Sequence, residues 1–579
     1  MKFNLRKLLK YLKKCWIFAL LAPLCMMLEA TMDLYQPTLM ADIIDVGVAN
    51  GDLSYVLATG GKMLLFSFVG MIGGILCTVF SSIASSRFAA ELRKSLFAKI
   101  QKFSFAEIDK LKTSSLITRV TNDVTQMQHM VLMSLRVMVR SPLLFAGGVV
   151  MAIRLSPKLS TLFILMVPLI VVTIFFVISR SFPLFSVLQK SIDRVNTVMR
   201  ENLLGVKVVK AFVGRKQETN RFKTANEDLK AISIKSQMIT ILMWPIVNII
   251  MQFAVVAVLW FGGKMFTVGD IQTGEIMAFI NYLTQIMFSL TMSVMLFINF
   301  SRAKVSADRI NQVFETTPSV TDSADALDFS GHDVEFKNVY FKYHSSGQWV
   351  LEDISFKANA GETIGIIGST GSGKSTLAML IPRLYDVTEG EILIDGKNVR
   401  NLKTDALRDN TSVVLQESIL FSGTIEDNLR QGKENATEED LHIALDIAQA
   451  SEFVNALPDG ISSPVEQRGK NFSGGQKQRL SIARSLVRSP KILILDDASS
   501  ALDMATEAKL QTALKENITD CTTFIIAQRI SGVMYCDKIL VLDDGKISGI
   551  GSHAELLKSN EIYRSIVISQ LGEEAAKNG

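Results

Sequence analysis

The chain has 579 residues, of which 48% are hydrophobic. Its mean hydropathy of +0.29 is too high for a wholly soluble protein, so a large membrane-embedded part is expected. The formal net charge of +5 comes mainly from basic residues beside apolar segments, which argues against nucleic acid as a partner.

Six long apolar runs lie in the first half of the chain, and each is close to the roughly 20 residues that span the hydrocarbon core of a bilayer. The runs cover residues 16–40, 57–85, 133–155, 159–179, 239–266 and 275–300. From about residue 332 onward, short β-rich runs alternate with helical ones, which is typical of a soluble α/β domain. The sequence therefore predicts an all-α, six-helix transmembrane domain over residues 1–318, a linker over 319–331 and an α/β domain over 332–579.

Loop charge predicts the orientation, because Lys and Arg accumulate on the cytoplasmic side of membrane spans. Basic residues are frequent before the first run and in the segments that follow the second and fourth runs, whereas the first outer loop has no base before Lys62. Only Arg154 and Lys158, between the third and fourth runs, oppose the rule. We expect a multi-pass protein of the cell membrane whose termini and α/β domain are cytoplasmic.

The segments between the spans also carry information. The two cytoplasmic ones have helical periodicity and predict paired arms that reach on the order of 35 Å from the membrane. Residues 1–16 interleave bases with apolar side chains, which favours an interfacial helix over a cleaved signal peptide, since no small-residue cleavage site follows. The five cysteines have no metal-ligand spacing and are expected to be reduced.

One octapeptide of the α/β domain fits the pattern G-x-x-x-x-G-K-S. It consists of Gly368, Ser369, Thr370, Gly371, Ser372, Gly373, Lys374 and Ser375, after an apolar run over 363–367 and before a helical run over 376–384. In this strand–loop–helix context, glycines let backbone N–H groups surround phosphates at a helix N-terminus. The pattern predicts that Lys374 pairs with the β- and γ-phosphates of a nucleotide and that Ser375 ligates Mg²⁺.

Two further motifs accompany this loop. Residues 492–495 read as a buried strand that ends at Asp496, which suits a carboxylate delivered to Mg²⁺ at the edge of a parallel sheet. Ser473, Gly474, Gly475 and Gln476 precede a helical run over 477–487 and form a second anion-binding helix terminus. A single nucleotide cannot easily use both termini, so the second phosphate group is expected to come from another chain.

With these motifs in this order, nearly the whole chain resembles the ATP-binding cassette (ABC) transporters, of the exporter type with six spans fused ahead of the nucleotide-binding domain. In that family two such domains dimerise head to tail, and each ATP lies between one P-loop and the other chain's signature sequence. The resemblance implies the cofactors ATP and Mg²⁺. It also implies that Tyr343 stacks on adenine, that the P-loop and Thr376 bind ATP, that Ser375, Gln416 and Asp496 hold Mg²⁺, that Ser473 to Gln476 form the signature, and that Asp503 belongs to the loop at the dimer interface. Coupling segments are implied near residues 113–119 and 212–222.

The chain departs from the family at two catalytic positions. Asp497 follows Asp496 where the family usually has a Glu that polarises the attacking water, so the carboxylate is set back by about 1.5 Å. Because a general base must lie within roughly 2.6 to 3.2 Å of its proton, most of its effect should be lost. Gln528 replaces the family's His after Ile-Ala and cannot become cationic. Working variants remain an alternative for each residue alone.

The two departures together resemble one subunit of a heterodimeric exporter with a degenerate site. We expect a homologous half-transporter, carrying the catalytic Glu and His, as partner. The site with this chain's P-loop should bind ATP with little turnover, and this chain's signature should complete the partner's competent site. The alternatives are a homodimeric lipid or peptide exporter and an ATP-gated channel or regulator.

The membrane half gives few indications of the substrate. The resemblance implies export of amphipathic small molecules across the lipid bilayer, with multidrug efflux the commonest assignment. Glu29 and Asp33 lie four residues apart in the first span, where acids are expensive. They attract cationic substrates, have a role in an outer vestibule, or take part in interhelical pairing. Asn281 and Gln285 repeat this spacing in the last span, where interhelical hydrogen bonding is favoured.

Overall fold

The computed structural model describes residue 8 and residues 10–323, 326–329, 331–343 and 347–573. Contacts divide the chain into two compact units. The helical unit comprises residues 1–97 and 118–313, and the sheet unit comprises residues 98–117 and 314–579. The segment 98–117 therefore packs with the sheet unit although it lies between the second and third spans in sequence.

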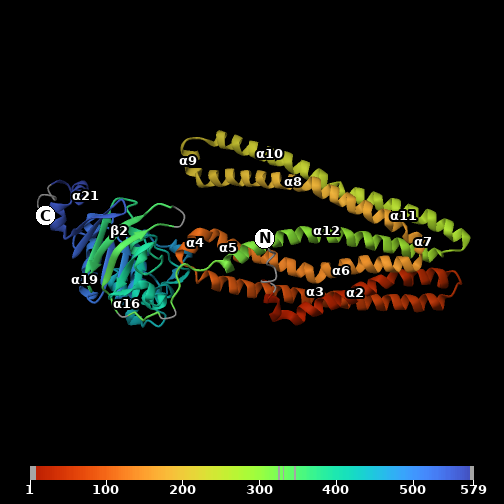
Figure 1. The fold of residues 1–579 in the computed structure, drawn as a ribbon, viewed down its shortest axis with the longest axis horizontal. Helices are drawn as coiled ribbons and strands as arrows, with labels where there is room; N and C mark the ends of the chain where they lie inside the picture. Colours follow the sequence, from red (N-terminus) through yellow and green to blue (C-terminus); the bar gives the residue numbers. More distant parts are fainter. Residues whose placement is uncertain (1–7, 9, 324–325, 330, 344–346, 574–579) are drawn as a thin grey trace. The chain divides into compact units, whose positions relative to one another are not determined.

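Long helices build the helical unit (Figure 1). They are α2 (Trp16–Asp42), α3 (Leu53–Ile100), α6 (Val124–Leu155), α8 (Leu162–Leu204), α10 (Arg215–Ile241), α11 (Met243–Val268) and α12 (Thr273–Glu315), with the short helices α7 (Pro157–Ser160), α9 (Val206–Ala211), η1 (Lys10–Cys15), η2 (Ile43–Val48) and η3 (Arg119–Asp123) at their ends. Within the described residues, six helical stretches are long and apolar enough to cross a membrane, which confirms the six predicted spans. Of the interfacial helix expected over residues 1–16, residues 1–7 and 9 lie outside the described part, and η1 covers its end.

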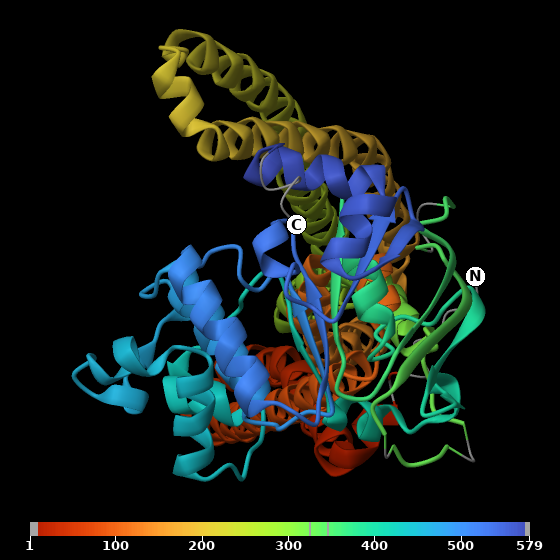
Figure 2. The ribbon, with the colours of Figure 1, turned by 90° about the vertical axis from the view of Figure 1, so that its left-hand side faces the viewer.

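One predicted arm is visible as a helical hairpin. In Figures 1 and 2, α8 and α10 run side by side and α9 joins them at the tip. The turn of the hairpin is apolar and open, because Leu204, Phe212 and Val213 are 82%, 82% and 84% exposed. The short helix at the tip covers Val206–Ala211 and thus precedes the coupling segment expected at 212–222.

Two main sheets form the sheet unit. The strands are β1 (Val334–Phe341), β2 (Leu351–Ala358), β3 (Thr363–Gly368), β4 (Glu389–Ile394), β5 (Lys397–Asn398), β6 (Thr411–Val414), β7 (Gly423–Thr424), β8 (Pro464–Val465), β9 (Ile492–Asp496), β10 (Thr522–Ile526), β11 (Lys538–Asp543) and β12 (Lys546–Gly551). A six-stranded sheet has the order β12-β11-β3-β10-β9-β6, and only β12 is antiparallel to its neighbour. An antiparallel sheet has the order β2-β1-β4-β5.

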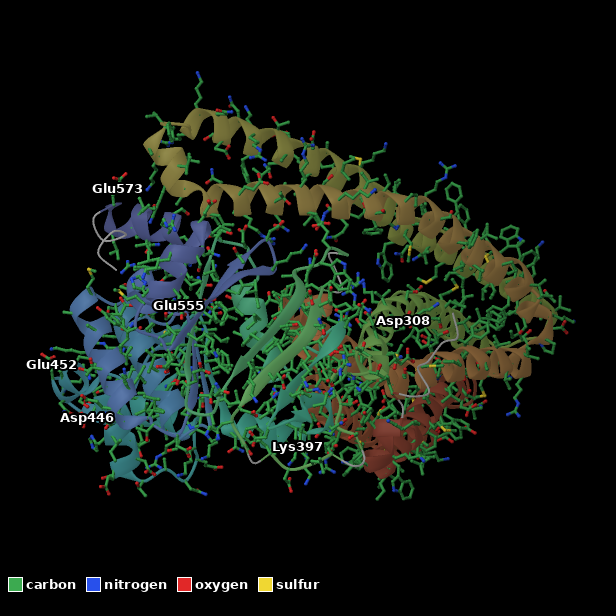
Figure 3. All side chains as sticks on the ribbon, turned by 60° about the vertical axis from the view of Figure 1, so that its left-hand side comes forward. Asp308, Lys397, Asp446, Glu452, Glu555 and Glu573 are labelled. Atoms are coloured by element: carbon green, nitrogen blue, oxygen red, sulfur yellow. The ribbon has the colours of Figure 1, made fainter. Side chains whose placement is uncertain are left out.

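Helices surround these sheets. They are α4 (Phe105–Leu111), α5 (Thr113–Thr118), η4 (Val399–Asn401), α13 (Lys374–Leu380), α14 (Thr404–Asn410), α15 (Ile425–Arg430), α16 (Glu438–Ile447), α17 (Ser451–Asn455), η5 (Gly460–Ser462), η6 (Gln467–Gly469), α18 (Gly474–Leu486), α19 (Met504–Asn517), η7 (Ile530–Gly532), α20 (His553–Ser559) and α21 (Glu561–Leu571). Their outer faces carry charge: Figure 3 labels Asp446 on α16, Glu452 on α17 and Glu555 on α20, all exposed. The predicted α/β fold is confirmed, although the helices expected over 376–384 and 477–487 begin two and three residues earlier.

Period-two alternation explains the layering around the parallel sheet. All five residues of β9 are buried. Ile492 and Ile494 pack into one apolar core with the antiparallel sheet, whereas Leu493 and Leu495 pack into a second core with the helices on the opposite face. A parallel sheet covered on both faces needs such continuous apolar strands, and its polar ends are then the places where a site can form.

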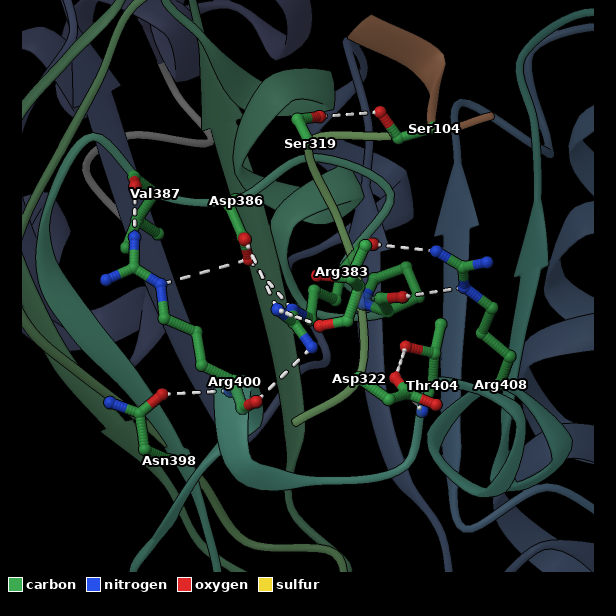
Figure 4. A network of polar contacts seen from close by, with 12 residues as sticks. Ser104, Ser319, Asp322, Arg383, Asp386, Val387, Asn398, Arg400, Thr404 and Arg408 are labelled. Atoms are coloured by element: carbon green, nitrogen blue, oxygen red, sulfur yellow. Dashed lines mark hydrogen bonds and ion pairs between the residues drawn. The ribbon is translucent and has the colours of Figure 1, made fainter. Parts of the chain in front are cut away.

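The segment expected as a linker is bound to the sheet unit. Figure 4 shows the polar network around Arg383. Its guanidinium donates to the carbonyl of Thr321 (3.3 Å), and the amide of Thr404 donates to Asp322 (3.0 Å). The hydroxyls of Ser104 and Ser319 are 2.8 Å apart. Within the sheet unit, this segment therefore contacts both residues 98–117 and the sheet domain.

Candidate functional site

The carboxyl ends of four adjacent strands position the site. Strand β10 lies between β3 and β9, with Ile526 aligned with Ile366 on one side and Asp496 on the other. Strand β6 pairs with the outer edge of β9. Because parallel strands end at one edge of the sheet, the loops after all four strands converge there. This register brings the P-loop, Gln416, Asp497 and Gln528 to one place.

The P-loop has the backbone conformation that its glycines permit. Gly371 and Gly373 have left-handed φ values of 88° and 95°. A Cβ on Gly371 would meet nothing within 4 Å, whereas one on Gly373 would lie 2.7 Å from Leu351 Cδ2. The loop is thus open at Gly371 and tightly packed at Gly373.

Lys374 lies inside the loop and its Nζ donates to the carbonyl oxygens of Gly368 (2.9 Å) and Ser369 (2.7 Å). Burial lowers the pKa of the Lys374 ammonium from its usual value. Beside it, the hydroxyl of Ser372 is buried and has no hydrogen-bond partner among the described residues. An orphaned donor in an open glycine loop fits a phosphate group.

Ser375 and Asp496 form the part of the site that fits a divalent cation. The hydroxyl of Ser375 donates to Asp496 Oδ1 at 2.9 Å. Burial raises the pKa of Asp496, and the bond from Ser375 partly offsets this. In the part of the chain that is described, no cluster of three or more His, Cys, Asp or Glu is arranged to hold a metal. Oxygen ligands of this kind fit Mg²⁺ that is shared with phosphate oxygens rather than enclosed by protein.

Asp497 is at the centre of an amide cluster. Its Oδ2 accepts from Gln528 Nε2 at 3.1 Å and from Gln416 Nε2 at 3.4 Å. The backbone of Asp497 is left-handed, with φ 50°, and its amide donates to the carbonyl of Ile526 (2.9 Å). Burial raises the pKa of this carboxyl. The two residues that depart from the family pattern are thus in direct contact.

Tyr343 lies beside the helix that follows the P-loop. Its hydroxyl is 2.9 Å from the hydroxyl of Thr376. Its ring is edge-on to Tyr385, with 5.3 Å between ring centroids. The structure therefore brings Tyr343 next to the P-loop helix, and adenine stacking by this ring stays a prediction.

The residues predicted to form the signature lie at the start of α18. Ser473 is its N-cap, and the amide of Gln476 donates to Ser473 Oγ (3.3 Å) while the amide of Ser473 donates to Gln476 Oε1 (2.9 Å). Ser473 and Gly474 are exposed. Within the described residues no hydrogen bond joins this terminus to the P-loop, so the chain presents its two anion-binding termini separately.

Asp503 caps a helix. Its Oδ1 accepts from the amide of Thr506 (2.9 Å) and its Oδ2 from the hydroxyl of the same residue (2.7 Å), which starts α19. These bonds lower the pKa of Asp503. A contact across a dimer interface, which the family resemblance implies for this loop, stays a prediction.

Comparison with known proteins gives the family. A sequence profile of the ABC transporter transmembrane region matches residues 19–290, and a profile of ABC transporters matches residues 351–500. The chain is 40% identical over 574 residues to YfiB of Bacillus subtilis (strain 168), an uncharacterized ABC transporter ATP-binding protein, covering 99% of this chain and 100% of YfiB. The chain belongs to the ABC transporter family. It is also 39% identical to Rv1273c of Mycobacterium tuberculosis (strain ATCC 25618 / H37Rv), an ABC transporter ATP-binding protein, over 93% of each chain.

A solved structure gives the subtype of this ABC transporter. A bacterial Atm1-family ABC exporter with ATP bound superposes with a TM-score of 0.80 and 27% identity, covering 97% of this chain and 99% of that one. The chain is 33% identical, over 85% of each chain, to YgaD of Bacillus subtilis (strain 168), whose name assigns it provisionally to multidrug export. This ABC transporter is therefore a multi-pass exporter with ATPase activity in its sheet unit.

Two contacts near the candidate site of this ABC transporter were not predicted from the sequence. Buried Gln478 on α18 donates to the carbonyl of Asp497 (3.4 Å) and accepts from the amide of Ala501 (3.1 Å), so it ties α18 to the loop that follows β9. The hydroxyl of Tyr385 donates to Asp109 on α4 at 2.6 Å. Asp109 lies just before the coupling segment predicted at 113–119. A capping-box pattern from Ser104 to Glu107 signals the start of α4.

Proposed function

We propose that this chain is the degenerate half of a heterodimeric ABC exporter, with the transmembrane domain over residues 1–318 and the nucleotide-binding domain over 332–579. Its termini and nucleotide-binding domain lie in the cytoplasm. Its P-loop binds ATP firmly but hydrolyses it slowly. Its partner is a homologous half-transporter that carries a catalytic Glu and a His.

The contact between Asp497 and Gln528 carries this proposal. A water that attacks a γ-phosphate needs a base close to it, and the shorter Asp497 side chain is held by the amides of Gln416 and Gln528 instead. The neutral Gln528 amide donates a hydrogen bond but adds no positive charge where negative charge develops. Both changes lower turnover, whereas the parts that bind phosphate are complete.

The binding half of the site supports retained affinity for ATP. Lys374, the Ser372 hydroxyl and the glycine loop bind phosphate groups. Mg²⁺ held by Ser375, Gln416 and Asp496 would neutralise charge on the β- and γ-phosphates. Tyr343 would stack on the adenine. Slow turnover with firm binding makes this site a long-lived contact between two subunits.

A second subunit is supported by surfaces that this chain leaves open. The exposed Ser473 and Gly474 at the α18 terminus suit the γ-phosphate of an ATP bound by the partner. The apolar hairpin tip at Phe212 and Val213 is also exposed and suits a contact with a second nucleotide-binding domain. The substrate is an amphipathic small molecule, consistent with the multidrug assignment in the name of the relative YgaD.

The test is ATPase activity of the purified chain, alone and co-purified with the half-transporter encoded beside it. We expect at least tenfold higher activity with the partner, and we expect Asp497→Glu with Gln528→His to raise the activity of this chain alone. Lys374→Ala controls for contaminating ATPases. Full activity of the unmodified chain alone would show Asp497 and Gln528 to be working variants and favour a homodimeric transporter.

A further inference from the structure

A groove of about 560 Å³ lies between α2, α3 and α6 in the helical unit. One part of its wall is apolar and consists of Met26, Met71, Ile75 and Val79. The other part carries charge from Glu29, Asp33, Arg136 and Arg140. In Figure 1 these three helices run side by side. The groove therefore combines an apolar wall with a charged one inside the membrane-spanning half.

Both acids of the groove are already paired. Arg140 donates from Nη1 to Glu29 Oε1 at 2.6 Å and from Nη2 to Asp33 Oδ2 at 2.8 Å. The acids are therefore interhelical ion-pair partners and hold α2 to α6. This is one of the alternatives that the sequence left open, and it leaves neither acid without a partner.

Arg136 lies one helical turn before Arg140 and also lines the groove. Among the described residues it has no hydrogen bond and no ion pair. The neutral polar groups nearby are occupied with each other, because Gln36 donates to Ser67 (3.0 Å) and Thr78 to the carbonyl of Gly74 (2.9 Å). Arg136 therefore contributes a guanidinium with unused donors to a mixed groove.

An arginine inside a membrane span is costly unless it faces water or pairs with an anion, and such residues commonly mark ligand pathways. A guanidinium binds carboxylate and phosphate groups with two parallel hydrogen bonds. The thioethers of Met26 and Met71 adapt to varied apolar chains. The two walls thus fit the two ends of one amphipathic anion.

We propose that this groove binds the anionic head group of an amphipathic ligand on Arg136, with its apolar chain against Met26, Met71 and Ile75. The ligand is a carboxylate or phosphate amphiphile, either transported substrate or bilayer lipid. Binding itself does not depend on the function proposed above, and only the assignment as a transported substrate rests on it.

The test measures binding of radiolabelled dodecyl phosphate to the full chain in nanodiscs of uncharged lipid, with dodecyltrimethylammonium as the matched cation. Arg136→Gln should weaken dodecyl phosphate binding about tenfold, and Arg136→Lys should keep most of it. Arg154→Gln makes the same charge change at the end of α6 outside the groove and should have no effect. Equal binding of dodecyl phosphate to all four proteins, or preferential binding of the cation, would overturn the proposal.

A second arm separates the two sources of the ligand. Bilayer lipid as the source predicts that native mass spectrometry detects phosphatidylglycerol retained by the unmodified chain and lost from Arg136→Gln. Substrate as the source predicts ATP-dependent accumulation of dodecyl phosphate in inside-out vesicles that hold the exporter with its partner, and loss of this accumulation in Arg136→Gln. Failure of transport with intact Arg136-dependent binding would refute export and leave the anion site standing.

Discussion

At the scale of single residues, Asp497 has an unusual backbone conformation as well as a side chain in the candidate site. Its φ of 50° lies in the left-handed region, which Asp and Asn adopt more readily than longer side chains. Its carboxylate is buried and accepts from two amides rather than from a cation. The position therefore combines a permitted backbone with a carboxyl that burial disfavours in its charged form.

The raised pKa of Asp497 predicts a pH dependence of stability. A folded-state pKa above the unfolded value of about 3.9 means that the folded chain binds the proton more tightly. The contribution of this carboxyl to the free energy of unfolding is then fully present below about pH 3.9. It is lost as the pH rises through the raised pKa of the folded state. Asp497→Asn, which suits the left-handed backbone, should therefore raise the thermal midpoint at pH 8, and the gain should shrink as the pH falls toward the unfolded pKa of about 3.9.

The control for this prediction is Asp544→Asn. Asp544 has a similar φ of 44° but is exposed in the turn between β11 and β12. Its substitution makes the same side-chain change on a similar backbone without removing a buried carboxyl. If the two variants show the same pH profile, burial of Asp497 is not the cause.

At the scale of helices and strands, close packing and ion pairing hold the first three spans together. A Cβ on Gly73 of α3 would lie 3.1 Å from the carbonyl oxygen of Cys25, and one on Gly74 would lie 2.8 Å from Glu29 Oε2. Glycines thus let α3 approach α2 at the level of the Glu29–Arg140 pair. The Glu29–Arg140 ion pair and the close approach of Gly74 both involve the Glu29 side chain. A change in one contact is therefore expected to affect the other.

Breaking this ion pair should destabilise the helical unit. Arg140→Met leaves Glu29 and Asp33 unpaired and should cost about 3 kcal/mol, because an unpaired charge inside a membrane span is expensive. Thermal unfolding of the full chain in one detergent measures this loss. Adding Glu29→Gln and Asp33→Asn to Arg140→Met should recover most of it.

Lys158→Met is the matched control on the same unit. It breaks the exposed pair of Lys158 with Asp270, in which the side chains are 72% and 43% exposed, and should cost under about 1 kcal/mol. This pair also gives a partner to one of the two bases in the connection between the third and fourth spans. A loss as large as that of Arg140→Met would show that the position of the Arg140 pair inside the membrane span does not set its cost.

The short helix α4 is the element that links residues 98–117 to the nucleotide site. Tyr385 donates to Asp109 of α4 and packs edge-on against Tyr343, which contacts Thr376. Burial and the adjacent Asp109 raise the pKa of Tyr385, so the phenol stays a donor at neutral pH. The contacts form a continuous path from the P-loop helix to α4.

Tyr385→Phe should remove the Asp109 bond and leave the aromatic packing. We expect hydrogen exchange of α4 to become faster by about tenfold, as a bond to a charged group contributes roughly 1.5 kcal/mol, while ATP binding stays unchanged. Tyr563→Phe removes another buried hydroxyl, bonded to His553 at 2.6 Å, and should leave α4 unaffected. Equal exchange in both variants would show that the bond does not hold α4.

At the scale of the whole transporter, the two ATP sites to which this chain contributes should behave differently. One contains its P-loop, and the other contains its signature. In the complex with its partner, Gly474→Asp should abolish most ATPase activity, since it places a negative charge where the partner's ATP would bind. A Cβ at Gly474 meets only Ala501 Cβ at 3.7 Å, so the chain itself tolerates the change. Lys374→Ala should lower ATP occupancy but keep a substantial part of the turnover.

Both variants are compared by ATPase rate and by the amount of ATP trapped per complex. Similar losses of turnover from the two variants would indicate two equivalent sites and contradict the degenerate assignment. Loss from Lys374→Ala alone would place the competent site on this chain.

The sequence by itself determined the spans, the P-loop, the strand ending at Asp496 and the signature, because each is a local pattern of apolar spacing or turn residues. It also showed that Asp497 and Gln528 stand where the family usually has Glu and His. Helix starts at α13 and α18 were placed two to three residues late, because glycine and lysine beside the phosphate loops gave no helical signal.

Only the tertiary structure decided which of these residues meet. The register of β10 between β3 and β9 brings Gln528 within 3.1 Å of Asp497. Helix packing pairs Arg140 with both acids of α2, across separations of 107 and 111 residues, and leaves Arg136 unpaired among the described residues. The Tyr385–Asp109 bond spans 276 residues. Such contacts depend on how distant segments close on one another, and no local pattern of residues specifies that closure.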